Sequence, residues 1–158
     1  MRRDCCQREC WTLFADGAAR GNPGPAGIGY VLCSPEGQVV RRGAESIGKT
    51  TNNVAEYKAL LRGLEEALDQ GVKHLHIHSD SELLIRQLTG QYRVRQPHLK
   101  TIHGEVLSLL KQLGWHRLEH VPREANREAD RLANLGVAKG LPAGQGGLTA
   151  DQERKRHL

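Results

Sequence analysis

Four acidic residues of this sequence lie where predicted strands end or predicted helices begin. Carboxylates gathered at one spot repel one another strongly unless cations lie between them. Such a cluster suits Mg²⁺ or Mn²⁺, which prefer oxygen ligands and keep several waters. Two such cations can hold the attacking water and the departing oxygen of a phosphodiester. The residues that could form this cluster are Asp16, Glu56, Asp80 and Asp130.

Each of these acids, taken alone, also has a structural explanation. Asp16 suits a turn, and Asp130 suits the positive end of a helix dipole. Glu56 follows Asn53 at the spacing of a capping box. Asp80 suits the first turn of a helix whose N-cap is the serine at position 79. The hypothesis of a metal site therefore depends on whether the fold brings the four acids together.

The elements that position these acids follow from hydrophobic periodicity and turn signals. Short connections favour antiparallel pairing of the first three strands. The first helix supplies the crossover that a parallel fourth strand needs, so the sequence predicts an α/β fold with helices packed on a mixed sheet. The predicted strands are 11–15, 27–33, 38–47, 72–79 and 115–121, and the predicted helices are 54–70, 81–88, 98–113 and 125–138.

The regular patterning is confined to residues 11–138, which predicts one domain. A chain of 158 residues suits a single domain with a full hydrophobic core. Residues 1–10 are polar and aperiodic, and residues 139–158 are rich in glycine at their start and basic at their end. Both ends are predicted to be flexible.

The net charge of +5 favours a polyanionic partner, because Lys and Arg displace condensed counterions from phosphates. No apolar run approaches the roughly 20 residues that span a bilayer. The N-terminus lacks the apolar stretch of a secretion signal, so the expected location is the cytoplasm. In that compartment, Cys5, Cys6, Cys10 and Cys33 are expected to be reduced thiols.

Four segments give the sequence a clear resemblance to a known family. They are Phe-Ala-Asp-Gly at 14–17 with Gly-Asn-Pro-Gly-Pro at 21–25, Thr-Thr-Asn-Asn-Val-Ala-Glu at 50–56, His-Ser-Asp-Ser at 78–81 and Asn-Arg-Glu-Ala-Asp at 126–130. With these segments in family order over nearly all of 11–138, the chain resembles ribonuclease H, type 1, and in particular its shorter members.

The resemblance implies the ribonuclease H-like fold, an α/β fold with a five-stranded mixed sheet, its first three strands antiparallel, and helices on both faces. It implies that Asp16, Glu56, Asp80 and Asp130 bind two Mg²⁺ ions, with Mn²⁺ as a substitute. The implied activity is that of an endonuclease, which cuts the RNA strand of an RNA–DNA hybrid and leaves 5′-phosphate and 3′-hydroxyl ends. The implied protein is a monomer, and cleavage of double-stranded RNA stays open.

The resemblance also implies residues that hold the substrate. Asn52 and Asn53 match positions that contact the minor groove of the hybrid, where an amide can both donate to and accept from a 2′-hydroxyl. Asn22 and Thr51 match positions that hold a DNA phosphate. Asn126, at the start of the fourth segment, is a further candidate for substrate binding.

Two departures from the family pattern affect the expected activity. Longer members carry a basic, Trp-containing handle between the two middle helices, and some carry a separate hybrid-binding domain. Here residues 89–97 form only a short connection, which predicts weaker hybrid affinity and strong salt sensitivity. The loop before Asp130 lacks the histidine that many members have, and Arg123 is the candidate to stabilise charge or help phosphate leave in its place.

Three histidines alternate along the fourth predicted strand, at His74, His76 and His78. Side chains two residues apart on a strand lie roughly 6.6 Å apart on one face, so at most two could easily share a metal ion. These histidines are therefore predicted to be partly packed strand residues.

Two other functions remain open from the sequence. One is a non-catalytic protein that binds hybrids or double-stranded RNA on the same fold, although such a protein has no use for four repelling acids. The other is a 3′–5′ exonuclease with a related carboxylate site.

Overall fold

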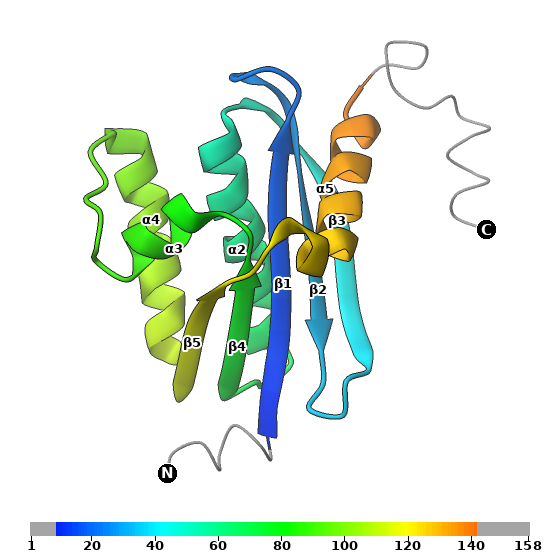
Figure 1. Cartoon of the computed structure of the whole chain (residues 1–158), viewed down its shortest axis with the longest axis vertical. Helices are drawn as coiled ribbons and strands as arrows, with labels where there is room; N and C mark the ends of the chain where they lie inside the picture. The colour runs from blue at the N-terminus through cyan, green and yellow to red at the C-terminus, as the bar shows by residue number, and fades with distance from the viewer. Residues whose placement is uncertain (1–8, 142–158) are drawn as a thin grey trace, which may run out of the picture.

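A five-stranded mixed sheet runs through the part of the chain that the computed structural model describes, residues 9–141 (Figure 1). The strand order is β3-β2-β1-β4-β5. β1, β2 and β3 are antiparallel neighbours, whereas β4 runs parallel to both β1 and β5. The strands are β1 (Cys10–Ala19), β2 (Gly24–Cys33), β3 (Val39–Thr50), β4 (His74–Ser79) and β5 (Trp115–His120). This confirms the predicted mixed sheet with its three antiparallel strands.

Helices cover both faces of the sheet, also as predicted. α2 and α4 pack together on one face, and α5 lies across β1, β2 and β3 on the other (Figure 1). The helices are α2 (Asn52–Asp69), α3 (Glu82–Leu88), α4 (Pro97–Gln112) and α5 (Arg127–Lys139), with the short 3₁₀ helix η1 (Arg123–Asn126) before the last.

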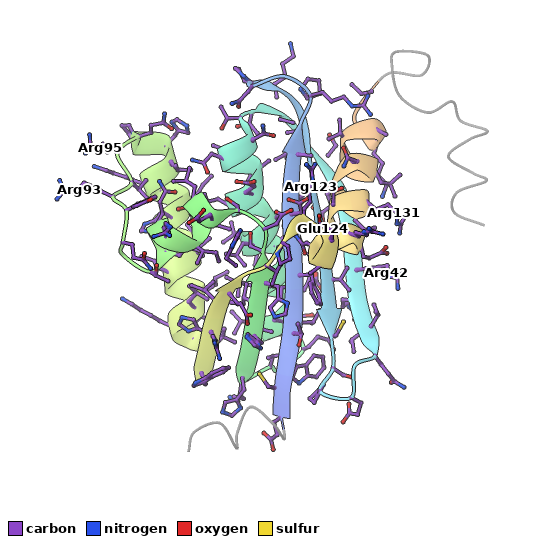
Figure 2. All side chains as sticks on the ribbon, in the orientation of Figure 1. Arg42, Arg93, Arg95, Arg123, Glu124 and Arg131 are labelled. Carbon is purple, nitrogen blue, oxygen red and sulfur yellow. The ribbon has the colours of Figure 1, made fainter. Side chains whose placement is uncertain are left out.

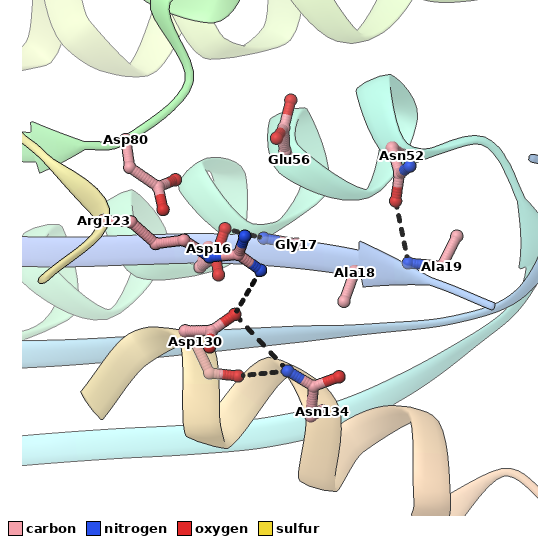
Figure 3. Close-up of a pocket in the computed structure, with 10 residues that line it drawn as sticks. All are labelled: Asp16, Gly17, Ala18, Ala19, Asn52, Glu56, Asp80, Arg123, Asp130 and Asn134. Atoms are coloured by element: carbon pink, nitrogen blue, oxygen red, sulfur yellow. Dashed lines mark hydrogen bonds and ion pairs between the residues drawn. The ribbon is translucent and has the colours of Figure 1, made fainter. Parts of the chain in front are cut away.

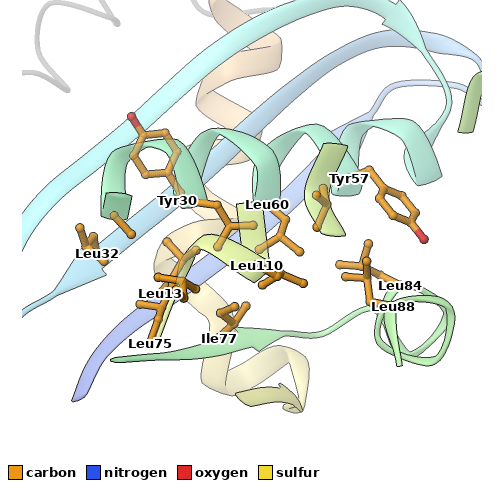
Figure 4. Close-up of a cluster of buried hydrophobic side chains, with 14 of the residues drawn as sticks. Leu13, Tyr30, Leu32, Tyr57, Leu60, Leu75, Ile77, Leu84, Leu88 and Leu110 are labelled. Atoms are coloured by element: carbon orange, nitrogen blue, oxygen red, sulfur yellow. The ribbon is translucent and has the colours of Figure 1, made fainter. Parts of the chain in front are cut away.

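The main hydrophobic core lies between the sheet and the α2–α4 layer (Figure 4). Leu13 and Ile77 from neighbouring strands are fully buried against Leu60 and Leu64 of α2 and Val106 of α4. Burying one such side chain contributes roughly 1.5–3 kcal/mol relative to leaving it exposed. This core holds β1, β4 and α2 in fixed positions, and these three elements carry Asp16, Asp80 and Glu56 at or near their ends.

α5 approaches the opposite face of the sheet closely at Gly29. A Cβ atom at Gly29 would collide with the backbone of Ala129 and Ala133, so the absence of a side chain lets the helix lie directly on β2. With Ala129 against the sheet, the next residue, Asp130, faces the side of α5 that borders β1 (Figure 3).

The predicted end of the first strand at residue 15 is wrong. β1 continues through Asp16 to Ala19, because Gly17, Ala18 and Ala19 pair with β2 in antiparallel register. The short apolar run in the sequence marks only the buried part of this strand. Asp16 therefore lies inside a strand and not in a turn.

The two segments predicted to be flexible, 1–10 and 139–158, lie mostly outside the described residues, as do Cys5 and Cys6. The described part reaches into them only at residues 9–10 and 139–141, with β1 beginning at Cys10 and α5 ending at Lys139. Among residues 9–141, no helix has the length and apolar character needed to cross a membrane.

Candidate active site

All four predicted acids line one cavity of about 470 Å³ (Figure 3). They come from four separate elements or their edges, and the cavity wall also includes Arg123, Asn52 and Asn134. The convergence on which the metal-site hypothesis depends is therefore present in the fold.

Asp16 is the buried member of the group, with only 7% of its surface exposed. Its Oδ1 accepts a hydrogen bond of 3.0 Å from the backbone N–H of Gly17. A Cβ atom at Gly17 would collide with the backbone of Ala55 and Glu56. Because Gly17 has no side chain, β1 and the first turn of α2 come into direct contact, and Glu56 lies beside Asp16.

The alternative explanation of Glu56 as the acid of a capping box with Asn53 is wrong. Thr51 is the N-cap of α2, and its Oγ1 accepts a hydrogen bond of 3.2 Å from the N–H of Val54. Asn53 lies inside the helix instead of capping it. The carboxylate of Glu56 interacts with Ser81 and with the charge of Asp80. It therefore belongs to the acidic cavity and not to the helix cap.

The predicted N-cap at position 79 is wrong as well. Ser81 caps α3 by accepting a hydrogen bond of 3.2 Å from the N–H of Leu84. Ser79 accepts a hydrogen bond of 3.1 Å from the N–H of Ser81 and so supports the turn between β4 and α3. Asp80 lies between these two serines, and its side chain points into the cavity (Figure 3).

Asp130 lies in the first turn of α5 and has two neighbours in the cavity wall. Asn134 Nδ2 donates to the backbone oxygen of Asp130 at 2.9 Å and to its Oδ1 at 3.4 Å. Arg123 Nη2 lies 4.0 Å from Asp130 Oδ1. Asn134 was not predicted from the sequence, although its position four residues after Asp130 puts both on one helix face.

The electrostatics of the cavity follow from burial and mutual repulsion. Burial, and then the charges of Asp80, Asp130 and Glu56, raise the pKa of Asp16 to about 9. Burial also raises the pKa of Glu56 to about 7, with a further rise from Asp80 and an opposing effect of the hydrogen bond with Ser81. The four carboxylates that line this cavity form a donor set that suits divalent cations with a preference for oxygen.

The residues predicted to hold substrate connect the turn after β1 to the start of α2. Asn22 Oδ1 accepts a hydrogen bond of 3.1 Å from the N–H of Asn52, and Asn52 Oδ1 accepts one of 2.9 Å from the N–H of Ala19. Asn52 itself lines the acidic cavity. Asn53 Oδ1 is buried and has no hydrogen-bond partner among the described residues.

Asn126 differs from the other substrate candidates because its side chain is only 1% exposed. Its Nδ2 donates a hydrogen bond of 3.0 Å to the backbone oxygen of Ala15. This contact attaches the start of α5 to β1 next to Asp16. The geometry gives Asn126 a structural contact, and its role in substrate binding stays a prediction.

Arg123 lies on η1 at the edge of the cavity, and 79% of its side chain is exposed. An ion pair that is this exposed contributes little to stability. The guanidinium therefore lies at the open edge of the cavity with Asp130 as a weakly stabilising partner.

The strand order and the cavity of four acids together define a protein of the ribonuclease H-like fold. A family model described as "Reverse transcriptase-like" matches residues 14–136. Ribonuclease H from Nitrosococcus oceani is 34% identical over 144 residues, which cover 81% of this chain and 94% of that protein. This chain therefore belongs to the ribonuclease H family.

Two further comparisons agree with this assignment. Ribonuclease HI from Halobacterium salinarum is 44% identical over 121 residues, which cover 77% of this chain but only 61% of that protein. LC11-RNase H1, in a crystal structure with an RNA/DNA hybrid, has a TM-score of 0.78 and 39% identity. That comparison covers 84% of this chain and 99% of the other.

Proposed function

We propose that this chain is an endonuclease that hydrolyses the RNA strand of RNA–DNA hybrids. Its catalytic carboxylates are Asp16, Glu56, Asp80 and Asp130. The observation that carries the proposal is the convergence of these acids in one cavity. Their proximity and burial strongly raise the pKa values of Asp16 and Glu56. A protein that only binds nucleic acid gains nothing from such repulsion, because phosphates are anions as well.

The four carboxylates would hold two Mg²⁺ ions, or Mn²⁺ in their place. The donor set is all oxygen and strongly anionic, which matches the preference of both cations. When bound, such cations activate water and stabilise the negative charge that develops on a phosphodiester. The protein holds the four acids in place through β1, β4, α2 and α5.

The edge of the cavity would recognise the hybrid. Asn52 and Asn53 would contact the minor groove, where an amide can donate to and accept from a 2′-hydroxyl. The oxygen of Asn22 is engaged with the N–H of Asn52, so its NH₂ group is the part that would donate to a DNA phosphate. Thr51 would bind the same phosphate. The hybrid bound to LC11-RNase H1, a relative at 39% identity, supports this substrate class.

Arg123 would act on the charge of the scissile phosphate. A guanidinium stays protonated, so Arg123 cannot serve as a general base. Its position 4.0 Å from Asp130, with most of its side chain exposed, suits a residue that stabilises an anion or assists its departure.

The decisive experiment uses Asp80→Asn and a hybrid whose RNA strand is blocked at both ends. The wild-type protein is expected to cut this substrate internally with Mg²⁺ or Mn²⁺ and to lose all activity with EDTA. Asp80→Asn should keep its circular dichroism spectrum while kcat falls by about a thousandfold or more, as for loss of a group that stabilises the transition state. Asp69→Asn makes the same change at an exposed site at the far end of α2 and should keep full activity.

Three outcomes would contradict the proposal. Full activity of Asp80→Asn would remove the site assignment. Cleavage of a matched hybrid with free RNA ends, but not of the blocked hybrid, would indicate an exonuclease. Hybrid binding without any cleavage would indicate a binding protein. A matched RNA duplex tests whether double-stranded RNA is cut too, and native mass spectrometry tests the expected monomer.

A further inference from the structure

The face of the sheet that carries α5 is only partly covered by helix. α5 packs on β1, β2 and β3, and within residues 9–141 no helix lies over β4 and β5 on that side (Figure 1). Leu75, Ile77 and Ser79 of β4 are buried on the opposite face, so His74, His76 and His78 face the uncovered side. In the parallel register, His78 pairs with Glu119 of β5.

Two of these histidines and Glu119 form a compact cluster. His76 Nε2 lies 2.8 Å from Glu119 Oε1, and His78 Nε2 lies 4.0 Å from the same oxygen. One ligand atom from each of the three residues lies within 4.8 Å of the others. The ring of His78 also meets the ring of Phe14 edge to face at 4.8 Å, which fixes its orientation.

A simple ion pair does not account for the whole cluster. The hydrogen bond between His76 and Glu119 satisfies those two groups, but His78 Nε2 is buried and has no hydrogen-bond partner among the described residues. An unpaired buried nitrogen is costly. A ligand shared by all three side chains would give this nitrogen a partner.

We propose that His76, His78 and Glu119 bind a transition-metal cation, with Zn²⁺ as the representative ion, at a site separate from the four catalytic carboxylates. Imidazole suits Zn²⁺, Cu²⁺ and Ni²⁺, whereas the all-oxygen cavity suits Mg²⁺. Two histidines and one glutamate are a known zinc donor set that leaves a fourth position open to water. The prediction that at most two of the strand histidines share an ion agrees with this geometry, since the third ligand comes from β5.

The observed distances are compatible with a tetrahedral ion. Zinc–nitrogen bonds of about 2.0–2.1 Å place two ligand atoms about 3.4 Å apart. The two distances to Glu119 Oε1, 2.8 and 4.0 Å, lie on either side of that value, so small side-chain rotations suffice. The exposed side chain of Arg117, which pairs with His76 in the register, adds a positive charge nearby. We therefore expect affinity in the micromolar range.

The test measures metal binding and not nuclease activity, so it is independent of the proposed function. Full-length protein freed of metal is titrated with Zn²⁺ by calorimetry in excess Mg²⁺, and with Co²⁺ by visible spectroscopy. One site is expected, with cobalt d–d bands and no thiolate charge-transfer band. His76→Gln and Glu119→Gln should each weaken binding by at least the roughly 10- to 100-fold that outer-shell partners cost in other metal sites. His74→Gln, on the same strand and face, should bind as the wild type does.

Several outcomes would overturn the proposal. Undiminished binding by either ligand variant would remove the site, and a thiolate band would assign the metal to cysteines. Loss of binding in Asp80→Asn, or an equal loss in His74→Gln, would contradict the assignment to this cluster. Glu119 is 43% exposed in its side chain, so Glu119→Gln decides the matter even if His76→Gln disturbs the sheet.

Discussion

At the scale of single residues, Asp16 connects the chemistry of the cavity to the stability of the protein. It is buried, while Glu56, Asp80 and Asp130 are half-buried. Its pKa is raised from 3.8 to about 9, so the folded state holds a proton that the unfolded state releases above about pH 4. In the absence of cations, this difference destabilises the fold increasingly as the pH rises toward 9.

The variant Asp16→Asn should therefore stabilise the cation-free protein at pH 8. One unit of pKa shift corresponds to about 1.4 kcal/mol, so the gain in free energy of unfolding should exceed about 1 kcal/mol. At pH 4 the gain should disappear, because Asp16 is then largely protonated in the folded state at little cost. Urea denaturation in EDTA at both pH values measures this, and an equal effect at the two pH values would contradict the assigned cause.

Divalent cations should reverse the order of stability. In the proposed metal site Mg²⁺ would bind the ionised acids of the wild type, so it should raise the wild-type melting temperature more at pH 8 than at pH 6. Asp16→Asn should show a much smaller increase, while Asp69→Asn should respond as the wild type does. Scanning fluorimetry over a Mg²⁺ series provides the measurement, and identical responses of all three proteins would argue against cation binding at Asp16.

Arg123 allows a test of charge stabilisation separate from stability. Arg123→Ala should lower kcat by about tenfold, roughly what one lost charge interaction contributes. The free energy of unfolding should change by less than about 0.5 kcal/mol, because the side chain is largely exposed. Arg123→Lys should recover part of kcat in single-turnover assays. A change confined to KM would assign Arg123 to substrate binding instead.

At the scale of elements, the contact between β1 and α2 depends on a residue without a side chain. Gly17→Ala would push the strand and helix apart, since its Cβ would collide with the backbone of Ala55 and Glu56. Overpacking of this kind costs about 1–3 kcal/mol. Hybrid cleavage should fall strongly as well, because Asp16 and Glu56 move relative to each other.

Gly104→Ala is the matched control for this variant. Gly104 lies in α4, is exposed, and has open space where a Cβ would be added. Alanine is favoured over glycine inside a helix by roughly 0.5–1 kcal/mol, so this variant should be slightly more stable and fully active. If both variants behaved alike in chemical denaturation and cleavage, the close contact at Gly17 would not be needed.

The sequence predicts the positions of the elements well where hydrophobic periodicity is strong. It predicts them less well where contacts between distant segments determine the bounds of an element. The helical spacing of apolar residues in α2 and α4 and the alternation in β4 are local signals. The predicted positions of these three elements are confirmed within a few residues. The extension of β1 to Ala19 depends on pairing with β2, which no local pattern reveals. The choice of Thr51 and Ser81 as caps was missed because several neighbouring residues can cap equally well.

The residues of the candidate site likewise divide into those that the sequence identifies and those that only contacts between distant segments reveal. The four acids were found because the predicted strand ends and helix starts that carry them should meet at one end of the sheet, and because whole segments resemble a family. Ser81 and Gly17 were not assigned to the site, since their contributions come from contact with Glu56 and the start of α2. Glu119 joins His76 only through the register of β4 with β5, which the sequence alone does not fix.

At the scale of the whole molecule, the short connection between α3 and α4 is where we expect the chain to meet a phosphate backbone. Arg93 and Arg95 are exposed there and project away from the body of the protein (Figure 2). Each phosphate contact made by such a residue releases counterions, so it strengthens binding most at low salt.

The double variant Arg93→Gln, Arg95→Gln should raise KM for the hybrid while kcat stays within about twofold. The slope of log affinity against log salt should become shallower by about one for each phosphate contact that is lost. Arg42→Gln is the control, because Arg42 lies on β3 and pairs with Glu128 at 3.6 Å. Equal salt slopes for the wild type and the double variant would exclude this connection from the binding surface.

The hydrogen bond from Asn126 to Ala15 spans 111 residues of sequence. During synthesis, β1 emerges from the ribosome early, and it waits for its last partner until η1 and α5 have followed. Until then Asp130 is absent from the group of acids, so the cavity of four carboxylates is incomplete. Docking of α5 is thus the event that completes the group of four acids.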